Sequence, residues 1–172
     1  MKDSRAVLLV VILIAIAVIG TWSYLAFFIH SPPLIDGIPC GLEGTVMHIH
    51  SHLDIFINGQ PYTIPAGVGI IPYKCLYWMH THDSSGVVHV ESPTQMDFTL
   101  GKFFDIWGKA FNNTQIFDYR AGSSNPLIVY VNGQSAGGNY RDIVFHEHEE
   151  IAIVYGTPPA QIPASYDFVP GL

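Results

Sequence analysis

The sequence contains little cysteine and little positive charge. Its two cysteines, Cys40 and Cys75, form no CxxC motif, which excludes a thioredoxin-type redox site. No phosphate-binding glycine loop is present, and Ser84 lacks the Gly-x-Ser-x-Gly context of a hydrolase nucleophile. After residue 29 the chain has only five basic residues against thirteen acidic ones, which disfavours nucleic acid and anionic lipid headgroups as partners. A domain with this charge attracts cations instead.

The longest uncharged segment, residues 6–29, lies near the N-terminus. Its 24 residues are enough to cross a hydrocarbon core of about 30 Å as a helix. Lys2 and Arg5 precede it and no basic residue follows until Lys74, so the positive-inside rule places the N-terminus in the cytoplasm. A cleaved signal peptide is the alternative, but its apolar region is usually about 7 to 15 residues long. We therefore predict an uncleaved single-pass anchor in the cell membrane, with the rest of the chain outside the cytoplasm.

Composition divides the chain into four parts. We predict a membrane anchor at 1–29, a linker rich in proline and glycine at 30–44, a globular extracytoplasmic domain at 45–156 and a proline-rich tail at 157–172. Both cysteines lie outside, where thiols are commonly oxidised, so a disulfide between Cys40 and Cys75 is expected. The alternative is that Cys75 is a soft metal ligand beside Met79 and His80.

The segment Met47–Ile57 has a histidine at every second position of its first half. Side chains alternate between the two faces of a strand, so a strand here places His48, His50, His52 and Asp54 on one face. The other face is then mostly apolar. Asn58 and Gly59 follow as a strong hairpin signal and predict a return strand at 62–64, with Ile57 facing Gln60.

A second hairpin is predicted over residues 75–91, with its turn at 83–86. In this register His80 faces His89, His82 faces Val87 and Trp78 faces Glu91. One face of the hairpin therefore carries His80, His82, His89 and Glu91, which no hydrophobic-core argument requires.

The rest of the chain predicts one helix and two more strands. Apolar residues at helical spacing indicate a helix at 99–111, and Leu127–Val131 is a continuous apolar strand. Residues 142–155 alternate as a strand that places His146, His148 and Glu150 on one face, unless a turn at Glu149 and Glu150 breaks this register. The expected fold is α+β: an antiparallel sheet of hairpins with one packed helix, β-grasp-like, preceded by an N-terminal transmembrane helix. A β-sandwich is the alternative.

Eight of the nine histidines fall in three clusters, each on a predicted strand. Two histidines at i and i+2 of one strand present their imidazoles on the same face, and imidazole is a good ligand for zinc and copper. Met47 and Met79 point to the opposite face, so plain histidine and carboxylate ligation by Zn(II) or Cu(II) is expected, with copper slightly favoured by the location. The candidate metal ligands are His48, His50, His52, His80, His82, His89, Glu91, His146 and His148.

Three functions remain open from the sequence. The first is a membrane-tethered, extracytoplasmic protein that binds copper or zinc for acquisition, buffering or delivery, with a membrane or surface protein as a possible partner. The second is a metal-dependent enzyme for hydration, hydrolysis or copper redox chemistry at a three-histidine site with an open position, with Glu91 or Asp83 as general base. The third is a surface module that binds a partner protein without a metal.

Four motifs carry a resemblance to a known family. They are His48-Ile-His-Ser-His-Leu-Asp54, Trp78-Met-His-Thr-His-Asp-Ser-Ser-Gly86, His89-Val-Glu-Ser-Pro93 and Phe98-Thr-Leu-Gly-Lys-Phe-Phe-Asp-Ile-Trp-Gly108. The chain resembles, over residues 44–155, an uncharacterised family of membrane-anchored exported proteins in archaea and some bacteria. That family has no established activity, so the resemblance implies export and anchoring but assigns no role to any residue.

Overall fold

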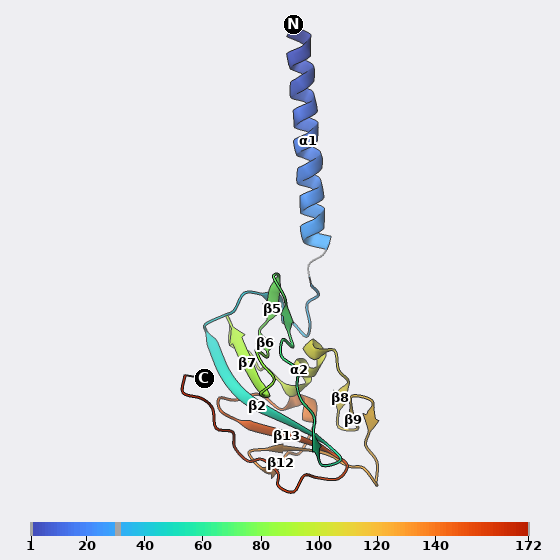
Figure 1. Cartoon of the computed structure of the whole chain (residues 1–172), viewed down its shortest axis with the longest axis vertical. Helices are drawn as coiled ribbons and strands as arrows, with labels where there is room; N and C mark the ends of the chain where they lie inside the picture. Colours follow the sequence, from blue (N-terminus) through green and yellow to red (C-terminus); the bar gives the residue numbers. More distant parts are fainter. Residues whose placement is uncertain (1, 30–31, 172) are drawn as a thin grey trace. The chain divides into compact units, whose positions relative to one another are not determined.

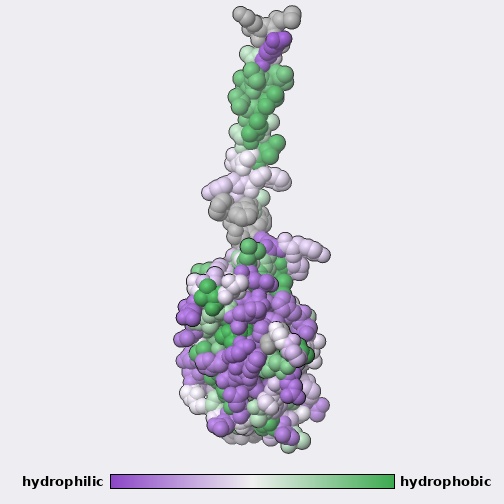
Figure 2. All heavy atoms as spheres, turned by 90° about the vertical axis from the view of Figure 1, so that its left-hand side faces the viewer, coloured by the Kyte–Doolittle hydropathy of each residue, from purple (hydrophilic) through white to green (hydrophobic). Residues whose placement is uncertain are grey.

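The computed structural model describes residues 2–29 and 32–171 and divides the chain near Pro33 into two compact units (Figure 1). The N-terminal unit contains the helix α1 (Lys2–Ile29), in which residues 4–26 are hydrophobic enough on average, and long enough, to cross a membrane. Figure 2 shows hydrophobic side chains along α1 and a largely hydrophilic surface on the displayed face of the C-terminal unit. This helix is compatible with a membrane anchor or a signal sequence.

The C-terminal unit is built around one mixed sheet. Its strand order is β12 (Gln134–Ser135), β11 (Leu127–Val131), β13 (Glu150–Tyr155), β2 (Met47–Ile57), β7 (Val87–Ser92) and β6 (Met79–His80), with β3 (Gln60–Pro61) paired to β2. The central strands β13 and β2 are parallel, so the prediction of a purely antiparallel sheet is wrong at this point. Parallel pairing needs a long connection, and the chain between β2 and β13 supplies one that includes the helix α2.

Two small antiparallel sheets flank the main one. The first has the order β1 (Cys40–Gly41), β5 (Cys75–Tyr77), β4 (Ile70–Ile71), and the second the order β10 (Tyr119–Arg120), β9 (Gln115–Ile116), β8 (Phe111–Asn112). A disulfide joins Cys40 to Cys75 within the first, which removes Cys75 as a thiolate ligand. Ile38 is fully buried in the core. Part of the segment predicted as a linker thus packs with the domain; residues 30 and 31 lie outside the described residues.

The helix α2 (Leu100–Trp107) begins where the sequence predicts and ends one turn earlier. Thr99 caps it, since its side chain accepts a hydrogen bond from the Lys102 backbone N–H. Gly108 ends it in the left-handed conformation with φ 68°, which glycine adopts without steric cost. Phe111, expected in the last turn of the helix, instead begins β8 and stacks on Phe104 with ring centroids 4.3 Å apart.

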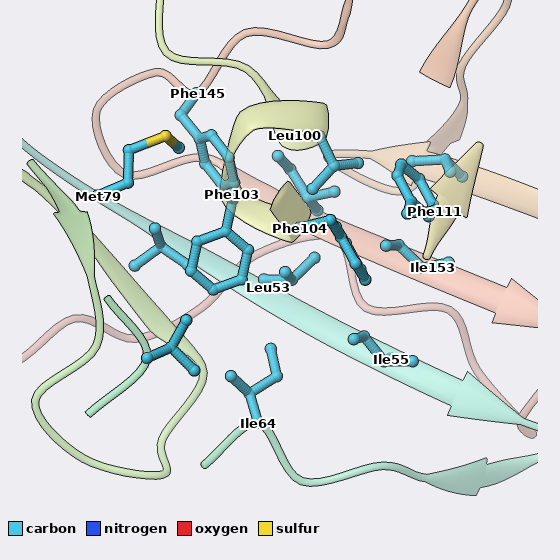
Figure 3. Close-up of a cluster of buried hydrophobic side chains, with 14 of the residues drawn as sticks. Leu53, Ile55, Ile64, Met79, Leu100, Phe103, Phe104, Phe111, Phe145 and Ile153 are labelled. Atoms are coloured by element: carbon cyan, nitrogen blue, oxygen red, sulfur yellow. The ribbon is translucent and has the colours of Figure 1, made fainter. Parts of the chain in front are cut away.

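The hydrophobic core lies between α2 and one face of the sheet. Figure 3 shows Leu53 and Ile55 of β2 and Phe103 and Phe104 of α2 pointing into one cluster, together with Met79. Full burial of such side chains stabilises the fold by about 1.5–3 kcal/mol each. The apolar face predicted for Met47–Ile57 is therefore the core face, and a helix rather than a second large sheet covers it. The histidines of β2 lie on the opposite face.

The predicted strand over residues 142–155 is wrong in its first half. A short 3-10 helix, η1 (Tyr140–Asp142), leads into an irregular segment in which Phe145 is buried in the core, and the strand β13 begins only at Glu150. His148 has a positive φ of 54°, which no strand accommodates. The alternating register therefore breaks before Glu150, and His146 and His148 do not lie on a strand.

Candidate metal centre

Pairing of β2 with β7, and of β7 with β6, brings two predicted histidine clusters together. His50 pairs with His89 and His48 with Glu91, while His89 also pairs with His80 on its other side. The predicted register of His80 opposite His89 is thereby confirmed. His82 does not reach the position opposite Val87, because β6 ends at His80 and the chain bends away.

Five imidazoles and one carboxylate form a continuous group, which we call the histidine cluster. Its members are His48, His50, His80, His82, His89 and Glu91. Neighbouring rings contact one another, with centroids 4.7 Å apart for His80 and His82, 4.5 Å for His82 and His89, and 4.7 Å for His50 and His89. His82 and His48 are exposed, whereas the other four residues are buried. The cluster is thus open to solvent at His48 and His82, and its other four side chains form a buried floor.

A backbone hydrogen bond holds the imidazole of His80, in the buried floor of the cluster, in a defined orientation. His80 is fully buried, and its Nδ1–H donates to the Tyr77 carbonyl oxygen at 3.0 Å. A carbonyl oxygen only accepts hydrogen bonds, so this contact fixes the proton on Nδ1 and makes Nε2 an acceptor, which faces Nε2 of His82 at 3.2 Å and not a backbone or carboxylate oxygen. Backbone acceptors commonly orient metal-binding histidines in this way.

The distances between candidate ligand atoms fit a single bound ion. Ligands at about 2.0–2.1 Å from a tetrahedral Zn(II) lie about 3.3 Å from each other. Nε2 of His80 is 3.2 Å from Nε2 of His82, and Nδ1 of His89 is 3.6 Å from Oε1 of Glu91. Oε2 of Glu91 lies 4.0 Å from Nε2 of His80, a gap that a small side-chain rotation closes. Each of His80, His82, His89 and Glu91 offers a ligand atom within 4.8 Å of the others.

Burial keeps the imidazoles of the cluster in the neutral form that metal binding requires. Burial lowers the pKa of His80 to about 4 and that of His89 to about 3, with a further decrease from neighbouring histidines. The pKa of His50 is also lowered, chiefly by burial. These imidazoles are therefore neutral at pH 7, the form in which histidine binds metals. Burial and the nearby Glu43 raise the pKa of Glu91.

Nδ1 of His89 is a buried polar atom without a hydrogen-bond partner among the described residues. Its nearest charged neighbour is Oε1 of Glu91 at 3.6 Å, beyond hydrogen-bond range. Such atoms are rare in folded proteins and call for an explanation. An ion held between His89 and Glu91 would give this nitrogen a partner.

His52 lies on the same face as the cluster but belongs to a different arrangement. Its Nδ1 is 2.7 Å from Oε2 of Glu150, and its Nε2 donates to the Ser85 carbonyl at 2.8 Å. Asp54 lies close by, and the three residues have the composition of a metal site. However, 2.7 Å is a hydrogen-bond length and is too short for two ligands of one ion. We interpret His52 and Glu150 as a buried ion pair.

The pKa of His52 and the close packing around its ring agree with this structural role. Burial alone lowers its pKa, but the hydrogen bonds and charge of Glu150 outweigh that effect and raise the pKa. Gly86 has a φ of 95°, and a Cβ on it would come within 2.9 Å of Nε2 of His52. Tyr166 of the C-terminal tail stacks on the imidazole at 3.8 Å. Both ring nitrogens and one ring face of His52 are thus occupied.

The third predicted pair, His146 and His148, does not join the others in a metal-compatible group among the described residues. His146 is exposed, and His148 stacks on Phe168 with centroids 4.6 Å apart while its Nε2 lies 3.1 Å from Oε1 of Glu147. Within residues 2–29 and 32–171, neither belongs to a group with metal-compatible spacing. The backbone N–H of His148 donates to the carbonyl of His50, so this loop supports the cluster through its backbone.

Sequence reasoning missed the groups that orient the imidazoles. The Tyr77 and Ser85 carbonyls carry no residue-type signal, because every residue has a carbonyl. Glu147, whose carboxylate accepts the backbone N–H of His50 at 3.1 Å, lies in the segment wrongly predicted as a strand. The sequence did identify Glu91 and Glu150 as carboxylates near histidine, and the structure places both there.

The sulfur atoms near the cluster in sequence are engaged elsewhere. Cys75 is in the disulfide and Met79 is buried in the core (Figure 3). In the part of the chain that the structure describes, no metal-compatible group of histidine, cysteine and carboxylate side chains includes a cysteine. The chain matches no protein-family model, no curated protein and no solved structure, so the geometry of this cluster carries the functional argument.

Proposed function

We propose that this protein is a membrane-anchored metal-binding protein that takes up Zn(II) or Cu(II) outside the cytoplasm, for acquisition, buffering or delivery. The observation that carries the proposal is the convergence of three imidazoles and one carboxylate, His80, His82, His89 and Glu91, within 4.8 Å of one another. Three of these side chains are buried. Burial of this many titratable groups is costly unless they serve a site.

The ligand chemistry restricts the metal. Imidazole and carboxylate suit Zn(II) and Cu(II), whereas Cu(I) prefers thiolate and thioether sulfur. Because Cys75 and Met79 are engaged in a disulfide and in the core, the site offers borderline and hard ligands only. We therefore propose a divalent ion, and Cu(II) outranks Zn(II) in intrinsic affinity for such ligands.

Two observations support the proposed location. The helix α1 has the length and composition of a membrane span, and the basic residues Lys2 and Arg5 lie at its N-terminal end, which favours a cytoplasmic N-terminus. The disulfide between Cys40 and Cys75 suits an oxidising compartment. A metal-binding domain tethered outside the membrane would meet ions before they enter the cell.

Two finer expectations also remain proposals. A β-grasp-like arrangement is supported by the strand order β7, β2, β13, β11, with a parallel central pair and α2 on one face. Membership of the family of exported proteins rests on the sequence motifs alone. Neither is needed for the metal-binding proposal.

Elemental analysis tests the proposal directly. The full-length protein, purified in detergent without chelator and without a polyhistidine tag, should contain zinc or copper. His82→Ala should lower the affinity at least 10-fold, because it removes a ligand from an exposed position without disturbing the core. His146→Ala is the matched control, since His146 is an exposed histidine outside the cluster. Absence of bound metal, together with no thermal stabilisation by Zn(II) or Cu(II), would overturn the proposal.

A further inference from the structure

We propose that the histidine cluster is a two-metal site in which the Glu91 carboxylate bridges the two ions. The first ion is held by His80, His82, His89 and one oxygen of Glu91. The second is held by His48, His50 and the other oxygen. This inference rests on the proposed metal-binding function and specifies its stoichiometry.

The number of ligands exceeds what one ion uses. The cluster offers five imidazoles and one carboxylate, whereas a tetrahedral Zn(II) takes four ligands. When His80, His82, His89 and Glu91 bind one ion, His48 and His50 remain beside it. These two residues form a second group of metal-compatible spacing with Glu91, and Glu91 is the single residue that the two groups share.

The orientation of Glu91 suits a bridge. Its Oε1 lies 3.3 Å from Nε2 of His48 and 3.6 Å from Nδ1 of His89, and its Oε2 lies 4.0 Å from Nε2 of His80. The carboxylate therefore lies between the two groups, within reach of ligands from both. Carboxylates in this position are common between paired ions, which lie about 3.5–4 Å apart in two-metal sites.

The strand register produces this arrangement. His48 lies opposite Glu91 and His50 opposite His89, so β2 supplies the second group while β6, β7 and the bend after β6 supply the first. Glu91 lies on β7, which runs between β2 and β6 in the sheet. A carboxylate on the middle strand of three reaches ligands on both sides.

The electrostatic surroundings favour a second cation. Glu147 lies beside His50, with Oε1 3.9 Å from its Nδ1. This carboxylate offsets part of the added charge of a second divalent ion.

The second ion would be the more accessible one. Its three protein ligands leave a coordination position open, and the His48 side chain is 57% exposed, so water or a small oxygen-containing ligand can reach it. The first ion has four ligands, three of them buried. The geometry thus combines a closed ion with an open one.

Metal stoichiometry tests the two-metal site. The full-length wild-type protein, equilibrated with Zn(II) in detergent, should bind two ions per chain. His48→Ala should bind one, because it removes a ligand of the second ion alone, and its exposed position leaves folding unaffected, as circular dichroism should confirm. His146→Ala should bind two.

Cu(II) gives an independent readout. Two Cu(II) ions bridged by one carboxylate couple magnetically, so the wild type loaded with two equivalents should show a weakened or broadened electron paramagnetic resonance signal. His48→Ala with its single Cu(II) should show an ordinary mononuclear spectrum.

The outcomes separate this inference from the proposed function. One ion per wild-type chain would overturn the two-metal site and leave the metal-binding function intact. Two ions in His48→Ala would also overturn it, because the second ion would then lie elsewhere. No bound ion in the wild type would overturn the proposed function itself.

Discussion

His50 and His52 are two residues apart on the same face of β2, yet their surroundings differ completely. Burial lowers the pKa of His50, and its ring contacts His89 inside the histidine cluster. The pKa of His52 is raised, since Glu150 and Ser85 engage both of its ring nitrogens. A histidine in a cluster is thus a ligand candidate only where a ring nitrogen is not hydrogen-bonded to a carbonyl or carboxylate oxygen. We expect His50 to serve metal binding and His52 to serve stability.

The largest expected effect is on stability at His52. His52→Ala leaves Glu150 buried without its partner, which should destabilise the protein by about 3 kcal/mol or more. The measurement is chemical denaturation of the metal-free, full-length protein in detergent. His50→Ala is the matched control on the same face and should cost less, because no buried charge loses its partner. Equal losses in the two variants would break the distinction between the two histidines.

The gain in stability on adding metal should depend on the histidine cluster and not on the pair of His52 and Glu150. Zn(II) at about 100 times its dissociation constant should raise the free energy of unfolding of the wild type by about 2.7 kcal/mol, because the ion binds the folded state. His52→Ala should gain a similar increment from its lower starting point, whereas His82→Ala should gain much less. Thermal melts with and without metal measure this. If Zn(II) raised the free energy of unfolding of His82→Ala as much as that of the wild type, the assignment of His82 as a ligand would be contradicted.

The two regions should respond to pH with opposite signs. His80 and His89 have folded pKa values of about 4 and about 3, below the ordinary value of 6.5, so the unfolded chain binds more protons in acid. Metal-free stability should therefore fall as pH drops from 6.5 toward 4, by about 1.4 kcal/mol per pH unit for each histidine. The raised pKa of His52 acts conversely: its contribution is complete below pH 6.5 and is lost as pH rises through the folded value.

Denaturation midpoints between pH 4 and pH 9 measure these slopes. His89→Gln should flatten the acid side of the profile, and His52→Gln should flatten the alkaline side. A wild-type profile without any loss of stability below pH 6.5 would show that the cluster imidazoles are not held neutral by burial.

The smallest expected effect concerns the C-terminal tail. Tyr166 stacks on His52, and Tyr166→Ala should lower stability by about 1 kcal/mol, the usual magnitude of an aromatic pair. Metal affinity should stay unchanged, since Tyr166 contacts the His52 pair and not the cluster. A drop in metal affinity would show that the tail also supports the metal site. Tyr73→Ala, at a fully exposed tyrosine, is the control.

Local pattern was sufficient for several elements. Alternation placed His48, His50 and His52 on one face of a strand, and the hairpin register of residues 75–91 placed His80 opposite His89, as observed. Helical spacing with Thr99 at its start located α2. These features depend on neighbours within about 15 residues, so the sequence contains the relevant information. The strand prediction was wrong for residues 142–149, because alternation alone does not reveal that Phe145 turns into the core.

By itself, the sequence determined which side chains share a face, the apolar helix α1, and a residue inventory rich in histidine and poor in free sulfur. Only the tertiary structure decided that β2 lies between β7 and β13. That placement sends His50 toward His89 and His52 toward Glu150, about 100 residues away along the chain. The physical reason is that a strand's pattern fixes the direction of its side chains, whereas the partners on that face come from distant segments chosen by core packing. The same histidine repeat thus yields a candidate metal ligand at one position and an ion pair two residues later.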